Sequence, residues 1–172
     1  PLGRIPVEWE VKTFKEVAKI NPDKILESTP KKYEIKYIDI ESVAAPDCII
    51  DFKTFLFEEA PSRARRIVET KDIIVSTVRP YLKAFAFIYP EYNGFICSTG
   101  FAVIRCYTAC AEFIFEFILS DFFVNQLLPI MAGSNYPAVN SRDIENVWVY
   151  YPPLKEQKSI SEMMKVLSRV MR

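Results

Sequence analysis

The segment from residue 111 to residue 131 constrains the fold most, because it is apolar around most of a helical circumference. Its apolar residues recur at helical spacing, with further phenylalanines between them: Ile114, Phe117, Ile118, Phe122 and Leu128. Acidic and amide residues within the segment argue against a membrane span. We therefore expect one buried Phe-rich helix at the centre of the core, kinked or ended by Pro129.

Strands are predicted on both sides of this helix. Runs of β-branched and aromatic residues, separated by proline, glycine and asparagine, cover residues 33–40, 72–78, 84–89, 94–97, 101–106 and 147–151. A short opening helix is expected over residues 13–20, where Thr13 and Glu16 have the spacing of a capping box. The combination predicts an α+β fold with a twisted sheet, either mixed or antiparallel.

The last segment, residues 154–172, predicts an amphipathic helix after the pair Pro152-Pro153. Its apolar residues are the candidates for binding a partner: Leu154, Ile160, Met163, Met164, Leu167, Val170 and Met171. Such a stripe requires something to pack against. Two arrangements are open, since the helix either packs back on its own domain or pairs with another helix or chain.

The chain contains no histidine, and this argues against the hydrolases that use histidine as a general base or zinc ligand. The four glycines form no phosphate-binding loop. We therefore expect no catalytic residue, no metal and no cofactor on this chain. An enzyme that uses Asp39, Asp72 or Asp143 as an acid or base is a minor alternative.

The cysteine pattern favours a reduced, cytoplasmic setting. Cys48, Cys97, Cys106 and Cys110 include no Cys-x-x-Cys pair, and a chain of 172 residues builds a core without disulfides. The first residues contain no apolar signal core. We therefore expect a cytoplasmic protein that makes no membrane contact.

The 22 basic and 22 acidic residues give a net charge of zero. An autonomous DNA-binding protein is usually basic, because neutralisation of phosphates supplies much of its affinity. DNA binding by this chain therefore requires either a local concentration of positive charge or a partner subunit that contributes a basic surface.

Six short motifs occur in order along nearly the whole chain. They are Gly3-x-Ile5-Pro6-x-x-Trp9, Tyr37-Ile38-Asp39-Ile40, Ala60-Pro61-Ser62-Arg63-Ala64-Arg65-Arg66, Asp72-Ile73-Ile74-Val75-Ser76-Thr77-Val78-Arg79-Pro80, Cys97-Ser98-Thr99-Gly100-Phe101 and Pro152-Pro153-Leu154-x-x-Gln157. The ordered set, rather than any single motif, resembles type I restriction-modification specificity subunits.

The resemblance implies a non-catalytic domain that recognises one half of a split duplex DNA target. Residues 1–152 would form the target recognition domain, and residues 153–172 would begin a spacer helix. The implied partners are an adenine methyltransferase (modification) subunit, which would bind S-adenosylmethionine, and the restriction subunit. The helix would also pair with a second recognition domain or, in a homodimer, with a second copy. Such subunits normally contain two recognition domains, whereas this chain contains one.

Three segments contain the side chains that we expect to contact DNA. Guanidinium forks, hydroxyls and amides bind phosphates and base edges, and aromatic rings pack on sugars or bases. The candidates are Arg63, Arg65 and Arg66 in the first segment, Ser76, Thr77, Arg79, Tyr81 and Lys83 in the second, and Ser134, Asn135 and Tyr136 in the third.

Each segment also has a structural interpretation. The arginines would form a solvated turn balanced by neighbouring glutamates, the second segment a hairpin with polar outer faces, and the third a turn that caps the preceding helix. Ser98-Thr99-Gly100 is interpreted as a turn or bulge between strands, with phosphate binding by its hydroxyls as the secondary interpretation. For the whole chain, the alternative function is a protein-interaction module that uses the terminal helix.

Overall fold

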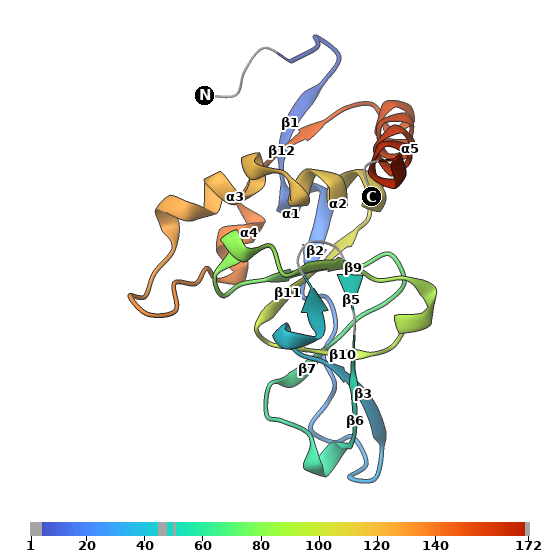
Figure 1. Ribbon diagram of the computed structural model, residues 1–172, viewed down its shortest axis with the longest axis vertical. Helices are drawn as coiled ribbons and strands as arrows, with labels where there is room; N and C mark the ends of the chain where they lie inside the picture. The colour runs from blue at the N-terminus through green and yellow to red at the C-terminus, as the bar shows by residue number, and fades with distance from the viewer. Residues whose placement is uncertain (1–4, 45–47, 50, 171–172) are drawn as a thin grey trace.

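The computed structural model describes residues 5–44, 48–49 and 51–170 of the chain. The molecule is elongated, with the helices gathered towards one end and strands β3 (Glu34–Ile38) and β6 (Lys53–Leu56) at the other (Figure 1). At the helical end, β1 (Glu10–Thr13) and β12 (Trp148–Tyr151) form a two-stranded antiparallel ribbon. This ribbon leads into the C-terminal helix α5 (Leu154–Val170).

Most of the remaining strands form two four-stranded sheets. One sheet is antiparallel throughout, in the order β2 (Ala18–Ile20), β11 (Phe101–Cys106), β8 (Ile73–Ser76), β9 (Phe85–Phe87). The other has the order β6, β3, β10 (Ile96–Ser98), β7 (Ala64–Ile67), and its β3–β10 pair is parallel. The predicted α+β class with mixed strand pairing is confirmed, although the strands are divided between two main sheets.

Short elements connect the sheets and helices. They are η1 (Ile40–Ser42), β4 (Val43–Ala44), β5 (Cys48–Ile49), η2 (Phe57–Glu59), η3 (Pro80–Leu82), η4 (Pro90–Tyr92) and α4 (Ser141–Glu145). None of them was predicted from the sequence, because single turns of helix and two-residue strands leave little periodicity.

The antiparallel sheet is buried on both of its faces. Ile73 and Val75 of β8 pack into the apolar core beneath the helices, whereas Ile74 between them packs into a second core on the opposite side. All three side chains are fully buried. A continuous apolar run is typical of a strand covered on both faces, which explains why this run was recognisable in the sequence.

The predicted single helix over residues 111–131 is wrong. The segment contains α2 (Ala111–Leu119), α3 (Asp121–Leu127) and the 3-10 turn η5 (Leu128–Ile130), with a bend of 69° between α2 and the rest. The bend lies at Ser120, whose backbone is extended and whose hydroxyl donates to the carbonyl of Phe117 (2.6 Å) and caps α3. Among the described residues, no single helix is long and apolar enough to cross a membrane; only this bent pair, taken together, passes that test of length and composition.

The predicted opening helix is shortened to a single turn, α1 (Phe14–Val17), which is followed directly by β2. The capping box is present, since the Glu16 carboxylate accepts from the Thr13 amide and from its hydroxyl (2.6 Å each). These hydrogen bonds lower the pKa of Glu16. The cap fixes where the helix begins, but pairing of β2 with β11 determines where it ends.

Helix α5 is attached to the domain mainly by polar side chains. Gln157 and Ser161 are buried, and Ile160 packs against the core beneath the helices. Most of the apolar stripe is exposed, with Met163 at 60% and Leu167 at 52% of their full surface. The helix therefore packs on its own domain through one side and leaves the apolar stripe open. The side chain of Val170 and the whole of Met171 lie outside the described residues.

Candidate nucleic-acid interface

A backbone hydrogen bond joins the Arg63 turn to the turn at residues 98–100. The amide of Thr99 donates to the carbonyl of Arg63 (2.9 Å), and both side chains are exposed. Gly100 is buried, and a Cβ at this position would lie 2.8 Å from Cδ1 of Ile40. The glycine therefore allows the turn to pack closely while Thr99 remains at the surface.

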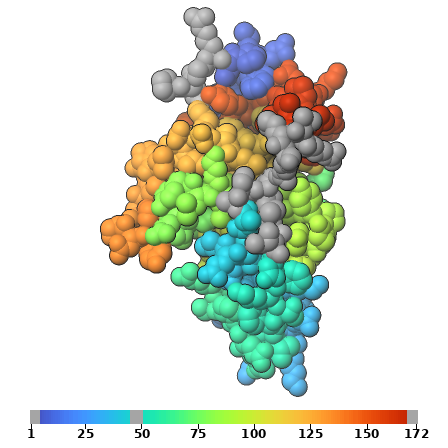
Figure 2. All heavy atoms as spheres, viewed as in Figure 1, coloured from blue at the N-terminus to red at the C-terminus, as the bar shows by residue number. Residues whose placement is uncertain are grey.

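The same turn is joined to the end of β8 and to the loop that follows η5. The amide of Thr77 donates to the carbonyl of Gly100 (2.8 Å), and the amide of Val139 donates to the carbonyl of Thr77 (2.9 Å). The amide of Arg79 donates to the carbonyl of Pro137 (2.8 Å). We call the surface formed by residues 63, 77–82, 99 and 133–142 the loop face. Figure 2 shows its green part, near residue 80, beside its orange part, near residue 135.

The side chain of Arg79 connects two of the predicted DNA-binding segments. Its Nη2 donates to the backbone carbonyl of Asn135 (2.8 Å), and its guanidinium lies 4.7 Å from the ring centroid of Tyr136. Its Nε is buried and has no hydrogen-bond partner in the described part of the chain. Residues that are 56 positions apart in sequence are thus held in contact.

The tip of the second loop is a tight turn that presents Tyr136. An isolated bridge between Ala132 and Ala138 closes the loop. Gly133 has φ of +101°, and a Cβ there would lie 3.1 Å from the carbonyl oxygen of Tyr136, so the turn requires glycine. Tyr136 is 68% exposed, and Ser134 and Asn135 are also exposed. All three predicted residues of this segment therefore lie at the surface.

The two predicted hydroxyls have internal partners. The hydroxyl of Ser76 donates to the carbonyl of Val78 (2.7 Å), and that of Thr77 donates to the carbonyl of Gly100 (2.9 Å). Both residues are buried, whereas Tyr81 is 40% exposed. In this conformation the hydroxyls support the loop face without forming part of its accessible surface.

Lys83 also has a structural role. Its ammonium donates to the carbonyl of Leu119 (2.8 Å) and to the carboxylate of Asp121 (2.7 Å), at the bend between α2 and α3. The hydrogen bond lowers the pKa of Asp121. The Lys83 charge is thus largely compensated within the chain.

The three clustered arginines do not form one patch. Arg65 and Arg66 are successive residues of β7, so their side chains point to opposite faces. Arg65 lies over the ring of Phe57 (5.7 Å), whereas Arg66 is opposite Cys97 on β10 and has a buried Nη1 without a partner among the described residues. Burial lowers the pKa of Arg66. Only Arg63, in the preceding turn, belongs to the loop face.

Asn21 was not predicted as a site residue, yet it positions one side of the loop face. Its backbone is left-handed (φ +53°), its Oδ1 accepts from the amide of Val103 (2.9 Å), and its Nδ2 donates to the hydroxyl of Ser141 (2.7 Å). It thereby anchors α4, on which Arg142 is exposed. The capping box of Asn140 and Asp143 was the available sequence signal for this short helix.

A family comparison covers almost the entire chain. The model described as the type I restriction modification DNA specificity domain matches residues 6–171. The chain belongs to this family. The resemblance drawn from the six motifs is therefore confirmed.

Relatives of this specificity domain include solved structures. The HsdS subunit from Thermoanaerobacter tengcongensis is 36% identical, with a TM-score of 0.88 over 99% of this chain and 44% of that subunit. A chain from a structure concerning complex assembly and conformational transition of the type I R-M system is 33% identical, with a TM-score of 0.88 over 98% of this chain and 44% of that chain. The S subunit from M. genitalium, at 10% identity and a TM-score of 0.58 over 97% of this chain and 41% of that subunit, shares the fold.

A curated relative agrees with these structures. The type I restriction enzyme MjaVIII specificity subunit of Methanocaldococcus jannaschii is 23% identical over 98% of this chain and 41% of that protein. The chain thus spans less than half the length of the relatives that it matches. None of these comparisons supports the alternative of a module that only binds protein.

Membership of a specificity-domain family also confirms the predicted non-catalytic role. The three carboxylates that were considered as acids or bases are used locally. Asp39 caps η1 and pairs with Lys53, Asp72 pairs with Arg105, and Asp143 caps α4. They belong to three separate structural contacts.

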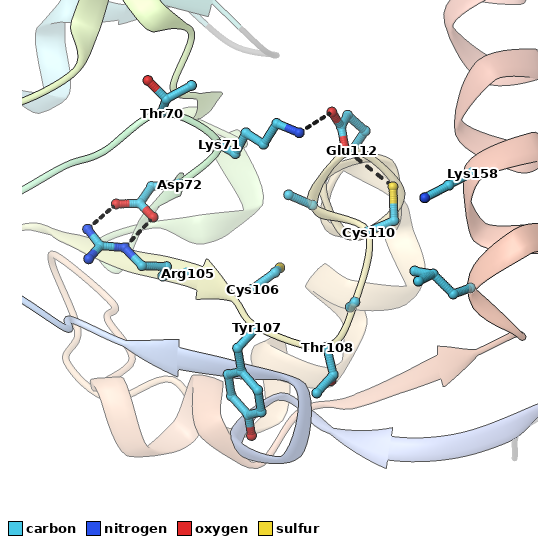
Figure 3. A pocket seen from close by; sticks show the side chains of 13 residues that line it. Thr70, Lys71, Asp72, Arg105, Cys106, Tyr107, Thr108, Cys110, Glu112 and Lys158 are labelled. Atoms are coloured by element: carbon cyan, nitrogen blue, oxygen red, sulfur yellow. Dashed lines mark hydrogen bonds and ion pairs between the residues drawn. The ribbon is translucent and has the colours of Figure 1, made fainter.

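A hollow of about 490 Å³ lies between the end of β11, the start of α2 and the first turns of α5 (Figure 3). Two ion pairs line it, since Arg105 donates twice to Asp72 and Nζ of Lys71 lies 3.8 Å from Oε1 of Glu112. Glu112 also accepts from the thiol of Cys110. Among the described residues, no cluster of three or more histidine, cysteine or acidic side chains is arranged to hold a metal ion.

Proposed function

We propose that this specificity domain recognises a short sequence in duplex DNA through the loop face. The observation that supports this proposal is the convergence of Arg63, Thr99, Arg79 and the 133–142 loop through backbone hydrogen bonds. Arginine and hydroxyl groups hold phosphates, whereas guanidinium and amide groups distinguish base edges in the major groove. The domain would thus determine which DNA sequence is bound and would catalyse no reaction.

The charge distribution supports the loop face as the site. Arg63, Arg79 and Arg142 form no ion pair with a carboxylate within the described ranges, although other cations such as Lys53 and Arg105 do. A chain with zero net charge can therefore still present locally uncompensated positive charge. DNA affinity would depend on these few arginines.

Within a complete type I system, the domain would recognise one half of a bipartite target. Residues 1–152 would act as the target recognition domain and residues 153–172 as the beginning of the spacer helix. The methyltransferase subunit, which would bind S-adenosylmethionine, and the restriction subunit are the proposed partners, in the cytoplasm. The exposed stripe on α5, including Met163, Met164 and Leu167, would pack against a second recognition unit, either in a longer chain or in a second copy.

Fluorescence anisotropy with a pool of randomised duplexes tests the proposal. Arg63, Arg79 and Arg142 are replaced together by alanine, and the matched control replaces Lys71, Lys155 and Lys158, three exposed lysines on or beside the hollow of Figure 3. The loop-face variant is expected to lose most binding, and its salt slope should fall by about 0.9 for each phosphate contact removed. The control should bind like the wild type. Equal losses in both variants, or no loss in the first even with the methyltransferase present, would overturn the assignment.

A further inference from the structure

We infer that Arg79 recognises a guanine base in the target, with Tyr136 holding the guanidinium in the orientation this requires. The inference rests on the proposed function, since it assumes that the loop face meets duplex DNA. It adds the identity of a specificity-determining residue and the base edge that it would contact, the N7 and O6 acceptors of guanine in the major groove.

The backbone of Arg79 is held in an unfavourable conformation. Its φ of +47° and ψ of +54° lie in the left-handed region, immediately before Pro80. For a residue with a Cβ, this conformation is unfavourable, and it persists only where neighbouring contacts impose it. The hydrogen bond from the Arg79 amide to the carbonyl of Pro137 and the turn η3 impose this conformation on Arg79.

The side chain is also held in place before any ligand binds. Tyr136 supports the plane of the guanidinium, and the Asn135 carbonyl takes one proton of Nη2. The Nε proton is buried without an acceptor among the described residues, so it is not available to DNA. Of the five guanidinium donors, three on the two terminal nitrogens therefore remain for a ligand.

A fixed, planar pair of donors matches the acceptor pattern of guanine. Guanine is the base that presents two adjacent acceptors in the major groove, and arginine binds them with two parallel hydrogen bonds. A phosphate can also accept two hydrogen bonds from a guanidinium, but phosphate contacts position the protein and carry no sequence information. The contact of Arg79 with the exposed ring of Tyr136 gives its guanidinium the fixed orientation that base recognition uses, and the sequence readout below separates the two kinds of contact.

Selection from a randomised duplex pool, followed by sequencing, separates the possibilities. The wild type is compared with Arg79→Asn, Arg79→Lys and Tyr136→Ala, and with Lys155→Ala as a control for an exposed cation outside the loop face. Asparagine tolerates the left-handed backbone, so Arg79→Asn should fold as well as the wild type, which a melting curve checks. Arg79→Lys retains a cation that can still bind guanine, though less rigidly.

The wild type is expected to enrich one motif that contains a guanine whose replacement weakens binding roughly tenfold or more. Arg79→Asn should lose the preference at that one position and keep the rest of the motif. Arg79→Lys and Tyr136→Ala should weaken the preference, and Lys155→Ala should leave it unchanged.

Two results would contradict the inference about Arg79 and leave the proposed function standing. One is an unchanged motif in Arg79→Asn, and the other is a uniform loss of affinity across all sequences, which identifies a phosphate contact. A wild type that enriches no sequence would instead overturn the proposed function itself, and this inference with it.

Discussion

Asp72, the residue before β8, is a buried carboxylate that pairs with Arg105 of β11. It is 1% exposed and accepts from Nε and Nη2 of Arg105 (2.8 Å each) and from the amide of Glu69 (2.8 Å). Asp23 and Glu69 complete the acidic surroundings of the guanidinium. The hydrogen bonds that Arg105 donates to Asp72 raise the pKa of Arg105.

Replacement Asp72→Asn is expected to lower the free energy of unfolding by about 2–3 kcal/mol, because it leaves the arginine without its main counter-ion. Urea denaturation measures this change. The control Glu91→Gln removes an exposed carboxylate and should change stability by no more than about 0.5 kcal/mol. A change below 1 kcal/mol in Asp72→Asn would show that the pair contributes little.

Residue types at the loop face could be predicted from the sequence, but their partners could not. Arg79, Asn135 and Tyr136 were selected as an arginine, an amide and an aromatic ring in loops, yet their contact spans 56 positions. Ser76 and Thr77 were expected at the surface because they are polar residues that follow an apolar run, whereas both are buried in the structure. Here their hydroxyls satisfy backbone carbonyls inside the fold.

At the level of elements, apolar periodicity predicted six strands, β3 and β8 to β12, and the start of α5, but it missed the remaining strands and the break between α2 and α3. The run containing β8 was recognisable because both of its faces are buried. The break at Ser120 was not, because one local hydroxyl contact overrides a periodicity that continues across it. The strand β7 was missed because its pairing with β10 is not local and two of its four residues are arginines.

Gln157 fixes the start of α5 to the rest of the domain. Its Oε1 accepts from the amide of Cys110 (2.8 Å), the residue before α2, and its Nε2 donates to the carbonyl of Pro152 (2.8 Å). The residue is fully buried. A second contact at the same end joins Nε1 of Trp9 to Glu156 (2.8 Å). These bonds orient a helix that has few apolar contacts of its own.

The variant Gln157→Leu keeps the volume and leaves the amide of Cys110 and the carbonyl of Pro152 without partners. We expect a loss of about 2–4 kcal/mol and faster hydrogen exchange along α5, measured by mass spectrometry. Lys158→Leu, one position further on and exposed, should leave exchange unchanged. Similar exchange in both variants would mean that the glutamine does not hold the helix.

At the scale of the whole molecule, the strand order places the loops together. The order β2, β11, β8, β9 brings the end of β8 beside the turn before β11, and this neighbourhood also receives the 133–142 loop. The fold class was predictable from the alternation of strand and helix patterns. The order of strands within two sheets was not, because it depends on pairing between distant segments.

The central claim is that the four segments of the loop face act as one DNA-binding surface. Hydrogen exchange of the domain, alone and with a duplex carrying the selected motif, tests it most directly. We expect residues 62–64, 77–82, 98–100 and 133–142 to become protected together, while β3 and β6 at the far end do not change. Protection confined to one of these segments, or centred on β3 and β6, would contradict it.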